Sequence, residues 1–123
     1  PKNNDEDLLN FNSPIPICAD ESCHTANDLA ALKGKYDFIN IKLDKTGGLT
    51  EALSLARIAT NQNFRIMIGC MVGTSLSIAP AVLLGAYAEF VDLDGPILLN
   101  QDRDNGLNFN NGKVSLPDRE LWG

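Results

Sequence analysis

The sequence predicts an α/β fold built around a parallel β-sheet, and three observations support this prediction. Four short apolar runs recur at intervals of roughly 22 to 28 residues, the length of one strand, one helix and two short loops. Segments with helical patterning fill the intervals, and strands that alternate with helices form parallel sheets. No Gly-x-Gly-x-x-Gly or Walker-type loop follows any run, which favours half of a (β/α)8 barrel over a nucleotide-binding doubly wound sheet.

The four apolar runs are the predicted strands. They cover residues 15–19, 36–43, 64–69 and 90–93. In the second run, Ile39 and Ile41 share one face because side chains alternate along a strand. Phe38, Asn40 and Lys42 share the opposite face. The isoleucine face suits contact with helices, so we expect Asn40 and Lys42 to point into the barrel.

The segments between the predicted strands carry helix signals. The first contains Thr25-Ala26-Asn27-Asp28, which resembles a capping box whose side chains cover free backbone N–H groups. The second follows Gly47-Gly48 and has an i, i+3/i+4 apolar stripe, made of Leu49, Ala52, Leu53, Ala56 and Ala59. In the third we expect Pro80 near the first turn, where its missing N–H is tolerated. The buried face of this third helix is expected to consist of Leu76, Ala79, Leu83 and Ala86.

A different pattern begins after Leu99. Residues 107–109 and 113–116 flank the sequence Asn111-Gly112, and Asn-Gly between two strand-like segments indicates a tight hairpin turn. We therefore expect two parts in the chain. Residues 1–99 form half of the barrel, and residues 100–123 form a C-terminal extension whose hairpin packs on it.

The composition excludes several classes of protein. With 44% hydrophobic and 21% charged residues, the chain has the composition of a soluble globular domain. Its net charge of −6 argues against nucleic-acid binding, which needs a basic surface. No run approaches the ~20 apolar residues of a membrane span. Cys18, Cys23 and Cys70 are an odd number without framework spacing, so we expect free thiols and a cytoplasmic location.

Ionisable side chains follow three of the four predicted strands, at the end where barrel enzymes carry their reactive groups. The first strand is followed by Asp20 and Glu21, the second ends at Lys42, and the fourth contains or precedes Asp92 and Asp94. The third ends in Gly69-Cys70-Met71, whose small or soft side chains suit a pocket wall. A lysine inside a barrel must either be paired with an anion or have its pKa lowered by burial and nearby cations, and a lowered pKa makes a lysine a proton carrier near neutral pH.

Each of these residues also has a structural explanation. A lysine at a strand end can extend to the surface, Asp20 and Glu21 can cap the next helix, and Asp92 and Asp94 can belong to a solvated turn. The Cys-x4-Cys-His spacing of residues 18–24 does not match a zinc site. The gathering of several such residues at one end of the strands favours a functional site over any single structural explanation.

Four sequence segments carry a family resemblance, in order and over about residues 15–96. They are 16–22 with Ala-Asp-Glu-Ser, 39–48 with Lys-x-x-Lys-x-Gly-Gly from Lys42, Ile68-Gly69-Cys70-Met71, and Asp92-Leu93-Asp94-Gly95-Pro96. Here the chain resembles the enolase superfamily, in particular the dipeptide epimerases of its muconate-lactonizing subgroup. The resemblance implies strands 5 to 8, the C-terminal half, of a (β/α)8 barrel. It also implies that the extension returns toward a capping domain.

The resemblance further implies a Mg²⁺-dependent epimerase that moves the α-proton of a dipeptide, of the L-Ala-D/L-Glu type, during cell-wall peptide recycling. Asp20 would be a Mg²⁺ ligand with Glu21 supporting it, and Lys42 one of two acid/base lysines. Asp92 would bind the substrate ammonium in a pocket shared with Asp94, Cys70 and Met71. Proton removal beside a carboxylate builds an enediolate, which a divalent cation stabilises.

The same resemblance places the other lysine, the other metal carboxylates and the capping domain upstream of this chain. We therefore expect the chain to hold part of a site, to need the upstream segment of the same enzyme as its partner, and to be inactive alone. A homo-oligomer is expected for the complete enzyme. The alternatives are an N-acylamino-acid racemase, a muconate cycloisomerase, an o-succinylbenzoate synthase, or a non-catalytic fragment or binding module.

Overall fold

A four-stranded parallel sheet organises the chain, as a computed structural model of residues 4–123 shows. Its strands are β1 (Cys18–Ala19), β2 (Phe38–Ile41), β3 (Arg65–Ile68) and β4 (Phe90–Val91). They lie in the order β1-β2-β3-β4, and every neighbouring pair is parallel. Strands that follow one another in the chain are therefore neighbours in the sheet, and the predicted α/β class with helical crossovers is confirmed.

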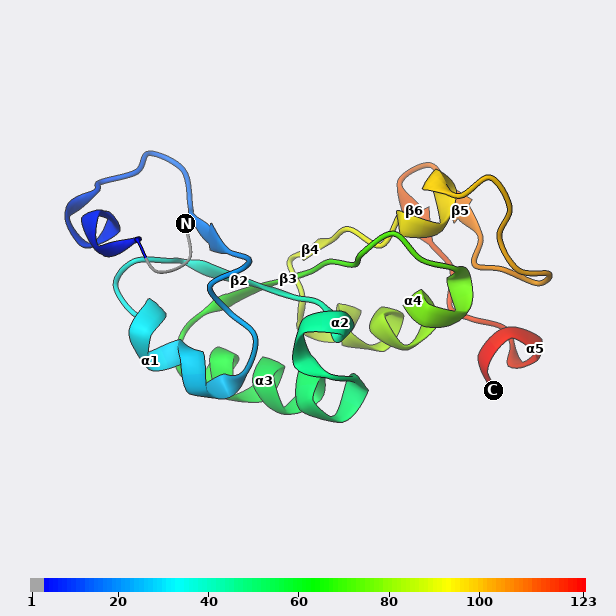
Figure 1. Cartoon of the computed structure of the whole chain (residues 1–123), viewed down its shortest axis with the longest axis horizontal. Helices are drawn as coiled ribbons and strands as arrows, with labels where there is room; N and C mark the ends of the chain where they lie inside the picture. The colour runs from blue at the N-terminus through cyan, green and yellow to red at the C-terminus, as the bar shows by residue number, and fades with distance from the viewer. Residues whose placement is uncertain (1–3) are drawn as a thin grey trace.

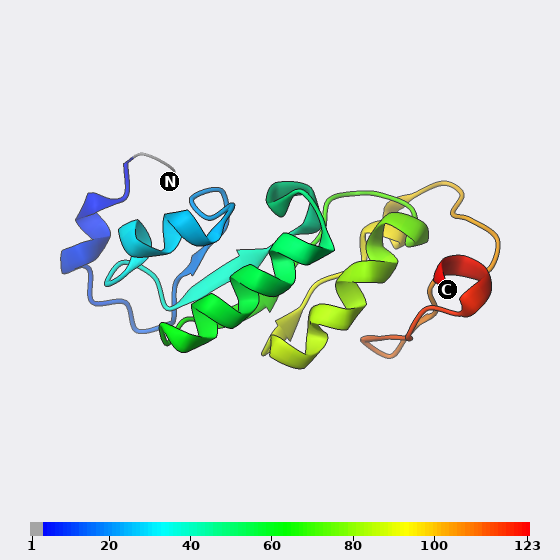
Figure 2. The ribbon, with the colours of Figure 1, turned by 90° about the horizontal axis from the view of Figure 1, so that it is seen from below.

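The crossover helices lie on one side of this sheet (Figures 1 and 2). They are α1 (Leu29–Leu32), α3 (Leu49–Asn61) and α4 (Ser75–Val82). The core fills the space between them and the strands, and Ile39 and Ile41 of β2 are almost completely buried in it. Full burial of such a side chain contributes about 1.5–3 kcal/mol, so the isoleucine face of β2 fixes which side of the sheet the helices cover.

The strands are shorter than the sequence suggests. The run 15–19 keeps only two residues as β1 because Pro14 and Pro16 have no N–H to donate. Ile17 is still paired, since its carbonyl oxygen accepts the N–H groups of Asp37 and Phe38 at 2.9 and 3.0 Å. The run 90–93 likewise ends as a strand at Val91.

The second strand also ends early, because a short helix follows it at once. β2 stops at Ile41, and α2 (Leu43–Thr46) occupies the last residue of the predicted strand 36–43. Gly47 ends α2 with φ 81°, a left-handed conformation that glycine adopts without strain. Lys42 therefore stands at the junction between a strand and a helical turn.

The predicted helix signals are partly confirmed. The Asp28 carboxylate accepts the backbone N–H of Thr25 at 2.7 Å and that of His24 at 2.9 Å, so the predicted cap forms before η2 (Ala26–Asp28) and α1. In α3 the buried face includes Ala52, Ala56 and Ala59 as predicted, together with Leu55; Leu49 and Leu53 are half-buried.

The third helix differs from its prediction. Pro80 lies inside α4, at its sixth residue, and not in the first turn. The chain then continues as a 3-10 helix, η3 (Leu83–Tyr87), which changes the period from 3.6 to about 3 residues per turn. The predicted stripe consequently fails at Leu83 and Ala86, which are exposed, while Ile78 and Leu84 are buried instead.

The C-terminal extension contains the predicted hairpin, at the end of the molecule opposite the 3-10 turn of residues 6–10 (Figure 1). β5 (Phe109–Asn110) pairs antiparallel with β6 (Lys113–Val114). The turn residues Asn111 and Gly112 have φ angles of 49° and 71°, the positive values that a two-residue hairpin turn requires. A 3-10 helix, η4 (Gly95–Leu98), precedes the extension, and α5 (Arg119–Trp122) follows the hairpin.

A buried serine joins the extension to α4. Asp102 accepts the N–H of Ser75 at 2.8 Å and also its hydroxyl, and the Ser75 hydroxyl oxygen accepts the N–H of Leu107 at 2.8 Å. Leu107 and Leu121 are buried in the same core as the strands. The extension is therefore packed on the sheet-and-helix unit, and the boundary we predict between residues 99 and 100 stays a prediction.

A lysine anchors the N-terminal turn, η1 (Glu6–Asn10), to the rest of the chain. Lys35 Nζ lies 2.9 Å from Asp5 Oδ1 and 2.7 Å from Glu6 Oε1, with 8% of its side chain exposed. The three cysteines are free thiols. Within residues 4–123, no helix combines the length and the apolar composition that crossing a bilayer requires.

Both edges of the sheet are open as far as residues 4–123 are concerned. Among these residues, β1 and β4 each have one neighbouring strand. On β4, Phe90 and Val91 are 57% and 46% exposed, and exposed apolar residues at an unpaired strand edge favour pairing with another segment.

Candidate active site

Three charged side chains meet at the carboxyl ends of β1 and β2. Asp20 follows β1, Lys42 follows β2, and Lys45 lies on α2. Lys42 Nζ lies 2.9 Å from Asp20 Oδ2, and Lys45 Nζ lies 2.8 Å from Asp20 Oδ1. Parallel neighbours end at the same edge of a sheet, so the two predicted residues Asp20 and Lys42 come into direct contact.

Lys45 is the residue of this cluster that the sequence analysis did not single out. Beyond the Asp20 carboxylate, its ammonium donates to the backbone oxygen of Asp20 at 2.6 Å and to that of Asn40 at 2.8 Å. The signal was present in the Lys-x-x-Lys spacing. A helical turn directly after Lys42 returns the chain toward the strand end within three residues.

Asn40 is the fourth member of the cluster and points, as predicted, to the same side as Lys42. Its Nδ2 donates to Asp20 Oδ2 at 3.3 Å, and its side chain is buried. Its Oδ1 has no hydrogen-bond partner among the described residues. A Cβ on Gly69 of the neighbouring chain segment would lie 2.6 Å from this oxygen. Gly69 is therefore the residue that leaves room for the Asn40 amide.

The charges of the cluster shift the protonation of its members. Burial disfavours ionised Asp20, but the hydrogen bonds from Lys45 and Lys42 outweigh it and hold the pKa of the Asp20 carboxyl below its usual value. The hydrogen bond to Asp20 raises the pKa of Lys42, against the opposing effect of burial. Of the two outcomes expected for a lysine inside the barrel, the structure therefore shows the paired one, because Asp20 Oδ2 lies 2.9 Å from the Lys42 ammonium.

These residues do not form a magnesium site by themselves. Within residues 4–123, no group of three or more His, Cys, Asp and Glu side chains could hold a metal ion. Mg²⁺ requires about six oxygen ligands, whereas Asp20 is a single carboxylate that two ammonium groups already neutralise. Glu21 is exposed and forms no hydrogen bond or ion pair within the described part. Further anionic ligands are needed before a divalent cation fits beside Asp20.

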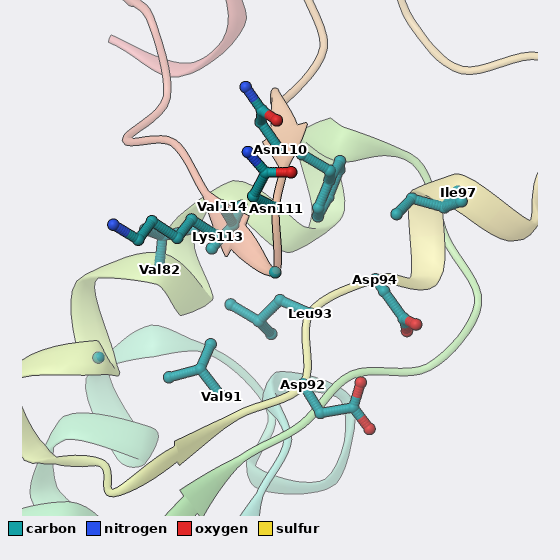
Figure 3. Close-up of a pocket in the computed structure, with 13 residues that line it drawn as sticks. Val82, Val91, Asp92, Leu93, Asp94, Ile97, Asn110, Asn111, Lys113 and Val114 are labelled. Carbon is teal, nitrogen blue, oxygen red and sulfur yellow. The ribbon is translucent and has the colours of Figure 1, made fainter.

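A second acidic site lies at the end of β4. In Figure 3 the carboxylates of Asp92 and Asp94 point to one side of the chain, and Val91 and Leu93 point to the other. Partial desolvation and the neighbouring charge of Asp94 raise the pKa of Asp92. Neither aspartate forms an ion pair within residues 4–123. Two adjacent carboxylates without a cation attract a positively charged ligand.

The loops after β3 and β4 touch each other beside these aspartates. A Cβ on Gly95 would lie 2.5 Å from the Met71 backbone oxygen and 3.1 Å from Cys70 Sγ. Cys70 is half-buried and Met71 is 47% exposed. The structure thus brings the predicted pocket residues next to the Asp92–Asp94 segment, and it requires glycine at position 95 for that approach.

A groove of about 790 Å³ separates β4 from the hairpin (Figure 3). It is lined by apolar side chains, among them Val82, Val91, Leu93, Phe109 and Val114, and also by Asp92, Asp94 and Lys113. Asp20, Lys42 and Lys45 do not line it. The groove therefore does not include the paired cluster at the ends of β1 and β2.

The amino-acid sequence matches a known family over almost its whole length. The family described as "Enolase C-terminal domain-like" matches residues 1–120. An N-acetyl-D-glutamate racemase from Pseudoalteromonas is 57% identical over 123 residues, 100% of this chain and 39% of that protein. The L-Ala-D/L-Glu epimerase of Escherichia coli K12 is 53% identical over 116 residues, 94% of this chain and 36% of that protein. The chain thus spans under two-fifths of the length of these relatives.

Solved structures agree with this family assignment. An enolase family member from Agrobacterium tumefaciens with homology to dipeptide epimerases, solved with sodium and L-Ala-L-Glu, has a TM-score of 0.97 and 54% identity. That comparison covers 100% of this chain and 38% of the other. A dipeptide epimerase from Enterococcus faecalis, solved with Mg and L-Leu-L-Tyr, has a TM-score of 0.71 and 38% identity over 78% of this chain and 29% of the other.

Proposed function

The chain belongs to the enolase C-terminal domain-like family, and on that premise we propose that the longer enzyme containing it epimerises a dipeptide of the L-Ala-D/L-Glu type. Its sheet is the C-terminal part of the barrel of that superfamily. The observation that carries the proposal is the 2.9 Å contact between Lys42 and Asp20 at the strand ends. The relatives at 53% and 57% identity are an epimerase and a racemase.

Lys42 is proposed to carry the proton on one face of the substrate α-carbon. Its ammonium has three N–H groups, and Asp20 takes one of them. With 14% of its side chain exposed, Lys42 remains accessible from the barrel interior. Epimerisation needs a second acid/base group on the opposite face, because one group removes the proton and another returns it. That second lysine is proposed to come from the part of the enzyme outside this chain.

Asp92 is proposed to hold the ammonium group of the dipeptide. Its pKa is raised by partial desolvation and by Asp94, which means that a cation in this position relieves repulsion between two carboxylates. Asp94 is proposed to share the same pocket, with Cys70 and Met71 forming its wall. An ammonium fixed at this end places the α-carbon at a constant distance from Lys42, which favours proton transfer.

Asp20 is proposed to contribute one oxygen ligand to Mg²⁺, with Glu21 supporting it through contacts outside the described residues. Mg²⁺, when bound, supplies positive charge beside the substrate carboxylate. The other ligands are proposed to lie outside this chain, since Asp20 alone does not fit the ion. The preference of Mg²⁺ for carboxylate oxygen is the chemical basis of this assignment.

A second candidate function is racemisation of an N-acylated amino acid such as N-acetylglutamate. The 57% identity to an N-acetyl-D-glutamate racemase favours it. N-acetylglutamate and Ala-Glu share a glutamate whose α-nitrogen is acylated, and they differ in the free ammonium. The dipeptide is preferred because the two carboxylates at the end of β4 form no ion pair within residues 4–123 and can bind its ammonium group.

The test uses the full-length enzyme with each substrate in separate reactions. We expect a kcat/KM for L-Ala-L-Glu at least tenfold above that for N-acetyl-L-glutamate, measured by polarimetry or NMR. A higher value for N-acetylglutamate would establish the second candidate. Absence of turnover with both, in a folded protein with Mg²⁺, would contradict both and favour a binding module.

The same proposal includes a cellular setting. The enzyme would act on peptides released from the cell wall, which are a source of Ala-Glu dipeptides. A cytoplasmic location agrees with the three free thiols.

A further inference from the structure

The ammonium group of Lys45 has its full set of hydrogen-bond partners within this chain. It has three N–H groups, and three oxygens lie within donating distance: the Asp20 backbone oxygen at 2.6 Å, Asp20 Oδ1 at 2.8 Å and the Asn40 backbone oxygen at 2.8 Å. Its side chain is 7% exposed. Lys45 therefore has no N–H group left for a substrate and little contact with solvent.

The three oxygens belong to two different strand ends. Two are on Asp20, which follows β1, and the third is on Asn40 of β2. One buried cation thus joins two neighbouring strands at the point where the chemistry is proposed to occur. α2 holds Lys45 in place, because the Thr46 hydroxyl donates to the backbone oxygens of Leu43 and Gly48 at 3.2 and 3.1 Å.

The arrangement also determines how the Asp20 carboxylate is oriented. Lys45 takes Oδ1, so Oδ2 is left facing Lys42 at 2.9 Å and Asn40 Nδ2 at 3.3 Å. Without the bond at Oδ1, the carboxylate could rotate about its side-chain torsions. It would then lose the single orientation that pairs it with Lys42.

We propose that Lys45 is a positioning residue that fixes the Asp20 carboxylate for Lys42 and for the metal. This inference rests on the proposed function and adds a residue to it. Lys42 and Lys45 thus have separate roles, although both contact the same carboxylate. Lys42 keeps two N–H groups for a substrate, and Lys45 keeps none.

The experiment compares Lys45→Met with Lys35→Met in the full-length enzyme. Lys35 is the matched control, since its ammonium is similarly buried and pairs with Asp5 and Glu6 at the far end of the chain. Loss of a residue that orients a metal ligand typically lowers metal affinity or activity 10- to 100-fold. We expect Lys45→Met to lower Mg²⁺ affinity by about that factor in calorimetry. Lys35→Met should lower the melting temperature and leave Mg²⁺ affinity unchanged.

The kinetic signature should agree with the calorimetry. In Lys45→Met, kcat should fall while KM for the dipeptide changes by less than about twofold, since no substrate contact is lost. Lys45→Arg keeps the charge but cannot direct three N–H groups at converging oxygens. Lys45→Arg should recover part of the lost Mg²⁺ affinity. If Lys45→Met does not fold, Lys45→Arg is used in its place.

A crystal structure of the folded variant decides the question independently of turnover. A rotated Asp20 carboxylate, separated from Lys42 Nζ by more than about 4 Å, the usual limit for an ion pair, supports the proposal. An unchanged Asp20–Lys42 contact overturns it, as does a loss of Mg²⁺ affinity below threefold. If the wild-type enzyme turns over neither substrate, the proposed function fails, whereas the position of Asp20 in the variant still tests Lys45.

Discussion

The ends of β1 and β2 and the end of β4 both carry charged side chains, but these are paired at the first place and not at the second. At β1 and β2, Asp20 contacts two lysines, and the cluster is closed by its own hydrogen bonds. At β4, Asp92 and Asp94 are exposed and form no ion pair within residues 4–123. The cluster at β1 and β2 is internally paired before a ligand binds. The two carboxylates at β4 are available to bind a positively charged ligand.

This difference teaches which part of the site the chain can preorganise alone. Neighbouring strands that end together bring Asp20 and Lys42 into contact, and α2 supplies a second lysine, Lys45, three residues later. β4 is an edge strand, so one of its sides faces whatever completes the barrel. Substitutions at the ends of β1 and β2 should therefore impair catalysis. Substitutions at the end of β4 should impair substrate binding.

The largest effect should come from Lys42→Ala in the full-length enzyme. Removal of a general acid/base lowers rates about 10²- to 10⁴-fold, and epimerisation should fall in both directions because each needs both lysines. Exchange of the α-proton with D₂O should survive for the epimer whose proton faces the remaining lysine. NMR from each epimer separately measures this, with exposed Lys33→Ala as control. An equal fall of exchange and epimerisation from both epimers would remove Lys42 from the mechanism.

Asp92→Asn should have the next largest effect, on binding. A hydrogen bond to a charged group contributes about 1.5–3 kcal/mol, so KM for the dipeptide should rise about tenfold or more. KM for N-acetylglutamate, which has no ammonium, should stay within about twofold of its wild-type value. Steady-state kinetics with both substrates measures the contrast. Equal changes for the two substrates would place Asp92 outside the ammonium site.

The pH dependence of the same variant sharpens the test. Because the pKa of Asp92 is raised, its carboxylate gains a proton at a higher pH than an ordinary aspartate. Dipeptide binding should weaken as pH falls through that raised pKa. The asparagine variant should lack this acid limb of the pH profile.

Gly69→Ala tests how tightly the closed cluster is packed. A methyl group there would lie 2.6 Å from Asn40 Oδ1, and forcing atoms into a packed interior costs about 1–3 kcal/mol. Urea denaturation should show this loss in the free energy of unfolding. Gly85→Ala is the matched control, since its Cβ meets nothing within 4 Å, and it should change stability by about 0.5 kcal/mol or less.

The smallest effect should come from Asp28→Ala, which removes the cap before η2 and α1. Loss of the cap should lower the free energy of unfolding by about 1 kcal/mol without changing kcat or KM. Although burial opposes ionisation, hydrogen bonds from Thr25 and His24 lower the pKa of folded Asp28. Its contribution is therefore present above the pKa of the unfolded chain and disappears as pH falls through the lowered value. The stability difference between wild type and variant should vanish in acid.

Much of this architecture could be predicted from local patterns. The interval between apolar runs gave the order of strands, and the alternation of Ile39 and Ile41 with Asn40 gave the orientation of β2. Asn111-Gly112 predicted the hairpin. These features depend on neighbours close in sequence, which is why a single chain reveals them.

The remaining features depend on contacts between distant segments. The anchoring of Lys45 requires a carboxylate 25 residues earlier, and the approach of Gly95 to Met71 requires two loops to meet. The predicted apolar stripe of α4 is wrong at Leu83 and Ala86 because η3 changes the helical period after Val82. Lys42 is paired and has a raised pKa because Asp20, which follows a different strand, lies 2.9 Å away. No periodicity of the chain contains this information.

The open edges of the sheet affect the order in which the barrel closes while the chain is being synthesised. In the closed barrel of the proposed full-length enzyme, the edge of β4 would pair with a strand far upstream, and the ribosome would have released that strand long before β4 emerges. The seam at β4 is then the last to close, and its large sequence separation makes closure slow. Until then Phe90 and Val91 stay exposed, and this late seam is where a nascent chain is most open to aggregation or to chaperone binding.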